Sequence, residues 1–103
     1  MNNFKVNITD LALMTLDENI LFLKNFNIEY SIKLREIIIK EIDKLVIFPH
    51  FHPIYKKTNK FIYRKLTVCK RYHIISTVIK NTIFIFYIID GRQQFDKYFN
   101  LLK

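Results

Sequence analysis

Three apolar runs with only two residues between neighbours constrain the fold more than any other feature of the sequence. The runs are 61–69, 72–79 and 82–89. Each is rich in Ile, Val, Phe, Tyr and Thr, which fit a pleated surface. A two-residue connection joins only antiparallel neighbours, because a parallel return needs a crossover of about a dozen residues. The sequence therefore predicts a three-stranded antiparallel meander.

The details of this meander follow from its turns and from its last run. Lys80-Asn81 is the predicted tight turn, with Asn81 suited to the positive φ that such turns need. The last run is apolar at both parities, so we expect both of its faces to be covered. Strict alternation predicts Phe84, Phe86 and Ile88 on one face and Ile83, Ile85, Tyr87 and Ile89 on the other. Gly91, the only glycine, indicates one backbone position with a special requirement, and Cys69 is expected to be a small packing residue in a strand.

The first half of the chain predicts a strand and two helices. Alternation over Asn3–Ile8 is typical of a strand with one buried face. Thr9 or Asp10 offers an N-cap for a helix that ends near 25–27, and a second helix follows over roughly 29–48. The two apolar stripes are Leu13, Leu16, Ile20 and Leu23, then Leu34, Ile38, Ile42 and Leu45. The short linker makes the helices an antiparallel hairpin.

The remaining segments are a loop and a short terminal helix. Residues 49–60 contain two prolines and are predicted to be a loop. His50 and His52 in this loop lack further ligands nearby, so we expect neither a metal site nor a cofactor. Phe95, Tyr98, Phe99 and Leu102 recur at helical spacing. The sequence thus predicts one domain over 1–103 with a strand, a helical hairpin, a three-stranded antiparallel meander and a short terminal helix in that order.

Composition limits where the protein acts. The longest stretch free of charge and strong polarity is 83–89, whereas a membrane span needs about 20 residues, so no membrane partner is expected. The N-terminus does not resemble a secretory signal, and a single cysteine forms no internal disulfide. We therefore expect a cytoplasmic protein.

The charge is concentrated in the half of the chain that forms the meander. Residues 1–48 carry six Lys or Arg and seven Asp or Glu, whereas residues 49–103 carry eleven Lys or Arg and only two Asp. A cationic sheet surface indicates an anionic partner, either nucleic acid or an acidic protein segment. Charge alone fits a merely soluble basic protein equally well.

Several short sequence motifs, taken in their order along the chain, resemble those of the RelE/ParE superfamily, the toxins of bacterial type II toxin–antitoxin pairs. The motifs are Phe48-Pro49, Tyr63-Arg64-Lys65-Leu66, Arg71-Tyr72-His73-Ile74-Ile75, Ile83-Phe84-Ile85 and Asp90-Gly91-Arg92-Gln93. Their style is closer to the ParE branch. The resemblance implies an α+β two-layer fold in one sheet, with the first strand beside the last, the hairpin on one sheet face, and a concave working surface on the other.

The resemblance also implies two activities. The ParE branch inhibits DNA gyrase and is not a nuclease, and the RelE branch cleaves messenger RNA on the ribosome without metal. We expect a ParE-like inhibitor neutralised by an acidic antitoxin, with gyrase as target. The alternatives are a RelE-like ribonuclease acting on ribosome-bound message and an inactive relic that only binds its antitoxin.

The nuclease alternative has a specific set of residues. Cleavage requires a base, an acid and cations for the developing charge. By the resemblance these are Lys65, His73, Arg92 and Tyr98. His73 replaces an arginine of the RelE branch, and the tyrosine is out of register by about one, which favours the inhibitor. The predicted partner surface comprises Tyr63, Lys65, Lys70, Arg71 and Arg92. Arg64 is expected to reach a sheet edge or a carboxylate such as Asp90.

Overall fold

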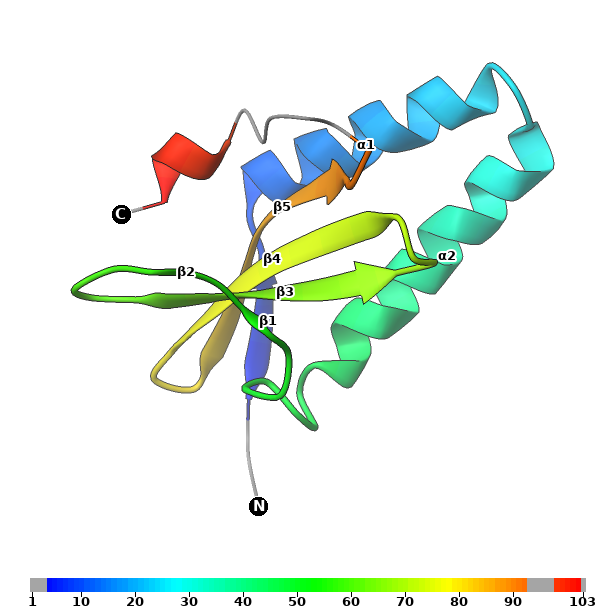
Figure 1. The fold of residues 1–103 in the computed structure, drawn as a ribbon. Coiled ribbons are helices and arrows are strands. Elements are labelled where there is room, and N and C mark those ends of the chain that lie inside the picture. The colour runs from blue at the N-terminus through cyan, green and yellow to red at the C-terminus, as the bar shows by residue number, and fades with distance from the viewer. Residues whose placement is uncertain (1–3, 93–97, 103) are drawn as a thin grey trace.

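A computed structural model shows a five-stranded mixed sheet with two helices packed on one of its faces (Figure 1). It describes residues 4–92 and 98–102. The elements in chain order are β1 (Lys5–Ile8), α1 (Asp10–Lys24), α2 (Ile28–Lys44), β2 (Ile54–Lys57), β3 (Ile62–Val68), β4 (Tyr72–Ile79), β5 (Thr82–Asp90) and a 3₁₀ turn (Phe99–Leu101). The strands lie in the order β1-β5-β4-β3-β2. The predicted α+β two-layer fold is therefore confirmed.

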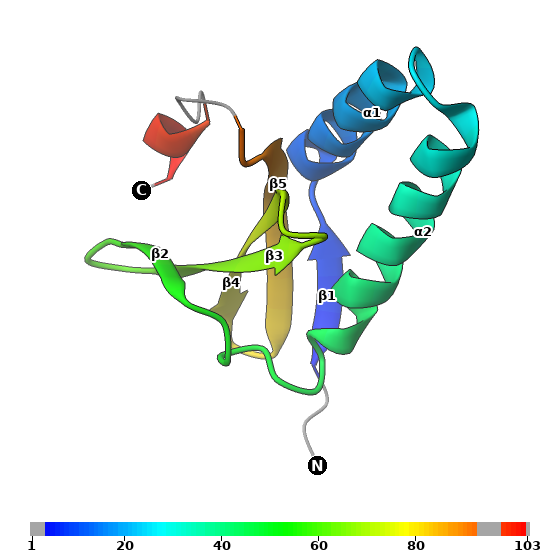
Figure 2. The ribbon, with the colours of Figure 1, turned by 45° about the vertical axis from the view of Figure 1, so that its right-hand side comes forward.

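Each helix of the hairpin begins at a side-chain N-cap. The Thr9 hydroxyl accepts a hydrogen bond from the Ala12 N–H, and the Asn27 side chain accepts one from the Tyr30 N–H. α2 ends at Lys44, four residues before the predicted end. Figure 2 shows α1 and α2 together on one side of the sheet. Their buried stripes form the main core with β3, β4 and β5: Leu16, Leu34, Ile38, Ile42, Leu66, Ile74, Ile83, Ile85 and Ile88.

β1 lies beside β5, as the resemblance implied, and pairs with it in parallel, with Val6 opposite Ile83 and Ile8 opposite Ile85. The two helices form the crossover that a parallel pair requires. β5 is thereby an interior strand of the sheet along Thr82–Ile85, flanked by β1 and β4. Its side chains also enter hydrophobic clusters on both faces, Ile83, Ile85 and Ile88 on one and Tyr87 and Ile89 on the other, which explains why its sequence is apolar at both parities.

A β-bulge at Phe86 corrects the predicted alternation of β5. Ile75 of β4 lies opposite Tyr87 and Ser76 lies opposite Ile85, so Phe86 has no partner in β4. The extra residue reverses the parity of everything after it. Ile83, Ile85 and Ile88 consequently share the face toward the helices, whereas Tyr87 and Ile89 belong to a second cluster. Phe84 and Phe86 are only half-buried.

Three predictions about irregular segments were wrong. The predicted loop 49–60 contains a strand, β2, which pairs antiparallel with β3 and extends the meander to four strands. Cys69 lies exposed in the β3–β4 turn, where Cys69 and Lys70 both have positive φ, and is not a packing residue. In the β4–β5 turn the positive φ belongs to Lys80, not to Asn81.

The sheet face away from the helices is covered in part by the C-terminal segment (Figures 1 and 2). Leu102 is buried in the second cluster with Tyr63, Ile75, Tyr87 and Ile89. The Lys56 Nζ donates to the Leu102 carbonyl at 3.1 Å and lies 4.3 Å from the centre of the Phe99 ring. The predicted terminal helix is only a 3₁₀ turn over 99–101, and its start at Phe95 lies outside the described residues.

No helix in the described part of the chain is both long enough and apolar enough to cross a bilayer.

Candidate functional site

Lys65 and His73 lie on the sheet face away from the helices. Lys65 of β3 is opposite Ile75, and Thr67 is opposite His73. Residues on one face at these registers are diagonal neighbours, typically about 7–8 Å apart. The Thr67 Oγ1 is 3.0 Å from the His73 Nδ1, which orients the imidazole. Both predicted residues therefore share one surface, and both are half-buried.

Gly91 makes room for His73. A Cβ built on Gly91 would lie 2.5 Å from the His73 Nε2 and 2.6 Å from the Arg71 carbonyl oxygen. Its N–H donates to that same carbonyl. The predicted special requirement is thus close approach of two strands, and not a positive φ, which no glycine has.

Asp90 is the centre of the charged cluster at the end of β5. Arg71 binds it through two nitrogens, Nε at 3.1 Å and Nη2 at 2.8 Å from the carboxylate oxygens. The Arg92 Nη2 lies 3.2 Å from the Asp90 Oδ2, and the Arg92 N–H donates to Oδ1 at 3.0 Å. Asp90 is 12% exposed and Arg71 24%, whereas Arg92 is 62% exposed. The sequence suggested Asp90 as a partner for Arg64, but Asp90 pairs instead with Arg71 and Arg92.

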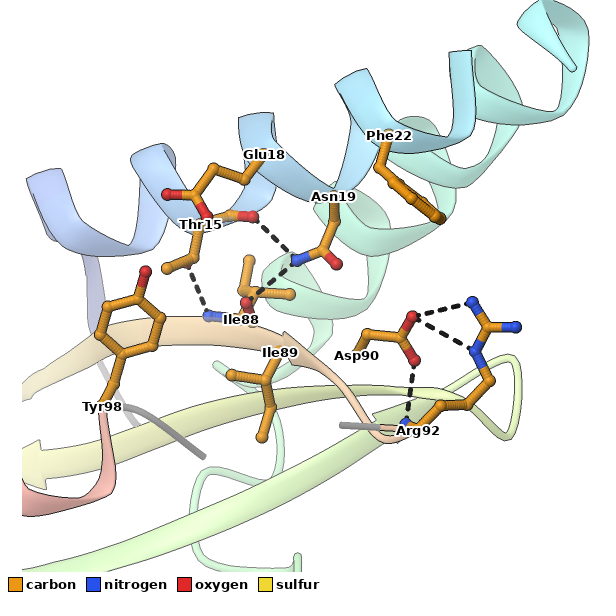
Figure 3. Close-up of a pocket in the computed structure, with 9 residues that line it drawn as sticks. All are labelled: Thr15, Glu18, Asn19, Phe22, Ile88, Ile89, Asp90, Arg92 and Tyr98. Carbon is orange, nitrogen blue, oxygen red and sulfur yellow. Dashed lines mark hydrogen bonds and ion pairs between the residues drawn. The ribbon is translucent and has the colours of Figure 1, made fainter. Parts of the chain in front are cut away.

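Arg92 and Tyr98 line a pocket between α1 and the end of β5 (Figure 3). Its volume is about 530 Å³, and its other lining residues are Thr15, Glu18, Asn19, Phe22, Ile88, Ile89 and Asp90. In Figure 3 the Tyr98 ring points toward α1 and the Arg92 side chain curls back on Asp90. The Tyr98 ring also packs against Tyr87, with 5.5 Å between ring centres. Lys65 and His73 do not line this pocket.

The residues of the predicted partner surface differ in how far they are exposed. Lys70 is exposed at the tip of the β3–β4 turn. Arg71 is committed to Asp90 and lies 5.1 Å from the centre of the Tyr72 ring, and burial raises the pKa of that tyrosine. Tyr63 is only 2% exposed and packs on Phe86 within the second cluster, so it presents no surface to a partner. Burial of Tyr63 is a correction to the predicted surface.

The geometry separates the four nuclease candidates into two pairs. Lys65 and His73 supply a cation and an imidazole on the sheet face, while Arg92 and Tyr98 face the α1 pocket. Acid–base cleavage of RNA requires its base, acid and cations around one phosphate, within hydrogen-bond reach. Because Lys65 and His73 do not line the pocket that Arg92 and Tyr98 line, the arrangement favours surface contact over chemistry.

Arg64 was left open by the sequence and has a distinct environment. Its Nη1 donates to the His52 carbonyl at 2.8 Å, which attaches the 45–53 loop to β3. Burial is the main cause that lowers the pKa of His52, with Glu41 opposing it. The sequence placed Arg64 in a strand at the parity of Leu66, and the structure finds it half-buried, but its partner depends on the path of a loop.

Among solved structures, the chain resembles a chain from the chromosomal ParDE TA system from P. aeruginosa. The match covers 87% of this chain and 98% of that one, with a TM-score of 0.74 and 16% sequence identity. No protein-family model matches the chain, and no curated protein matches its sequence. The similarity confirms the RelE/ParE-type fold that the sequence motifs predicted.

Proposed function

We propose that this protein is the toxin of a type II toxin–antitoxin pair, a ParE-like inhibitor of DNA gyrase that a cognate acidic antitoxin neutralises. The observation that supports this most is the fold similarity to the ParDE TA system over nearly the whole chain. The motifs that resembled the ParE branch fall on β3, β4 and the end of β5. The strong positive charge of residues 49–103 suits an acidic antitoxin segment.

Inhibition by binding is favoured because the candidate side chains do not line one common pocket. A binding surface tolerates separate contributions from Lys65, Lys70 and Arg92, whereas a nuclease requires convergence on one phosphate. The second candidate is a RelE-like ribonuclease, and the observation in its favour is that Lys65 and His73 share one face. A relic that only binds its antitoxin is the third.

The test is expression of the chain alone in a bacterium, beside Lys65→Ala, His73→Ala and Arg92→Ala. We expect growth arrest with gyrase-linked DNA breaks and intact messages, and arrest that persists in the His73 variant. A binding surface predicts gradual losses, whereas removing a catalytic cation or base would lower a cleavage rate about 10²–10³-fold. Lys24→Ala, an exposed lysine of α1, is the matched control.

Each alternative has its own outcome. Codon-positioned message cleavage that disappears in these variants would replace the gyrase proposal with the ribonuclease. If the folded chain is expressed without harm to the cell, only the third hypothesis, an inactive relic that binds its antitoxin, would stand. Arrest without DNA breaks or cut messages would also contradict gyrase as the target.

A further inference from the structure

A small cavity lies where the 45–53 loop passes the ends of β3 and β4, apart from the pocket at α1. Its volume is about 180 Å³, and it is lined by His50, Lys60, Phe61, Ile62, Arg64 and Val78. Lys60 and Arg64 are cations, and Phe61, Ile62 and Val78 are apolar. No carboxylate lines it among the described residues.

The cations of this cavity have no acidic partner within the described chain. Neither Lys60 nor Arg64 forms an ion pair with a described residue, and Arg64 donates instead to the His52 carbonyl. Between Asp43 and Asp90 the sequence contains nine Lys or Arg and no acidic residue. Glu41, the acid whose charge opposes the lowering of the pKa of the neighbouring His52 by burial, pairs with Lys44 at 3.6 Å. The charge of the cavity therefore calls for an anion from outside the chain.

Apolar side chains continue from the cavity onto the surface. Ile54 of β2 is the register partner of Arg64, so it lies beside it on the same face, and it is 54% exposed. Ile62 is exposed at the cavity itself. In the adjoining loop Phe48 and Phe51 pack on each other with 6.1 Å between ring centres, and Phe51 is 77% exposed. Exposed apolar groups gathered in this way are typical of interaction sites.

We propose that this cavity binds the carboxylate side chain of an acidic peptide segment of a partner protein. Lys60 and Arg64 bind the carboxylate, and Ile54 and Ile62 contact apolar residues on either side of it. The small volume suits one side chain, since sites for whole ligands occupy about 300–1,000 Å³. A phosphodiester chain would satisfy the cations but would offer little to aliphatic side chains. That the partner is the antitoxin rests on the proposed function, but the binding chemistry does not.

The test is an NMR titration of the full chain with the peptide acetyl-Leu-Glu-Leu-Glu-Leu-amide. We expect shifts centred on the amides of residues 60–64 and 78. The same peptide with Gln in place of Glu should bind about tenfold more weakly or worse, because it lacks the charge-assisted bonds. Oligo-uridine and inorganic phosphate are the competing anions. The result does not depend on toxicity, so it can fail or succeed separately from the gyrase proposal.

Variants locate the site. Lys60→Glu and Arg64→Gln should each weaken the acidic peptide about tenfold, whereas Lys80→Glu, at an exposed turn lysine, should leave its affinity within about twofold. Lys60 is exposed, so its variant is expected to fold even if loss of the Arg64–His52 bond disturbs the loop. Equal binding of the Glu and Gln peptides would overturn the proposal. Chemical shift changes that the peptide causes elsewhere on the protein would also overturn it. So would a cavity that binds oligo-uridine and does not bind the peptide.

Discussion

Asp90 organises more of the candidate site than any other single residue. It accepts hydrogen bonds from Arg71 of the β3–β4 turn and from Arg92 beyond β5, and its own side chain is largely buried. A buried charge is costly unless it is paired and hydrogen-bonded. The cluster therefore holds the β3–β4 turn against the end of β5, and it keeps Arg92 directed at the pocket.

Replacing Asp90 with asparagine tests this role. Asp90→Asn leaves Arg71 half-buried without its counter-charge, so the free energy of unfolding should fall by about 1–3 kcal/mol. The matched control is Asp17→Asn, which removes the Asp17–Arg35 pair, whose side chains are 66% and 46% exposed. A pair this exposed contributes only about 0–1 kcal/mol. Urea unfolding of both variants decides the matter, and equal losses would show that the Asp90 cluster is not special.

At the scale of elements, α1 completes the edge of β5 where β1 ends. β1 pairs only as far as Ile85, which would leave the backbone groups of 86–88 without a strand partner on that side. The Thr9 hydroxyl donates to the Ile85 and Phe86 carbonyls, and the Thr15 hydroxyl accepts from the Ile88 N–H at 2.9 Å. The Asn19 amide donates to the Ile88 carbonyl (Figure 3). Polar side chains of a helix thus protect a sheet edge.

Removing one of these hydroxyls should destabilise the fold. Thr15→Val keeps the shape of the side chain but leaves the buried Ile88 N–H without an acceptor, so we expect a loss of about 1–3 kcal/mol. Thr15→Ser retains the hydroxyl, so its loss of stability is expected to be clearly smaller. Thermal or chemical unfolding measures both, and hydrogen exchange at Ile88 should accelerate only in the valine variant. A stable valine variant with slow exchange at Ile88 would contradict this role for Thr15.

At the scale of the whole molecule, two cores lie on opposite faces of one sheet, and β5 contributes to both. The helices cover one face, and the 3₁₀ turn with Leu102 covers part of the other (Figure 2). The bulge at Phe86 is what allows Ile85 and Ile88 to enter the same core. The far-face cluster, Lys65 and His73 therefore lie on a face that the helices leave accessible.

Truncations within β5 distinguish this arrangement from strict alternation. Ile85→Ala removes a fully buried side chain and leaves an enclosed cavity, so it should cost about 2–5 kcal/mol. Phe84→Ala should cost clearly less, because that half-buried ring already meets solvent. Denaturant unfolding of the two variants compares them directly. A larger loss for Phe84 than for Ile85 would mean that the strand faces are assigned wrongly.

Much of the fold was determined by local patterns in the sequence. The three runs with two-residue gaps, the N-cap at Thr9 and the helical stripes at Leu34, Ile38 and Ile42 correspond to elements of the structure. These signals are strong because periodicity and capping act over neighbouring residues. The placement of the first strand beside the last came from the family resemblance, since no local pattern reports which distant strands meet. That the two strands are parallel is a finding of the structure.

What only the tertiary structure decided are the features that depend on register and on contact between distant segments. A one-residue bulge at Phe86 leaves no clear composition signal, yet it reverses the faces of Ile88 and Tyr87. Strand β2 has two prolines before it and forms because β3 supplies its hydrogen-bond partners. Arg71, and not Arg64, reaches Asp90 because the turn and the strand end meet in space. Side-chain partners follow from packing, which a sequence pattern does not contain.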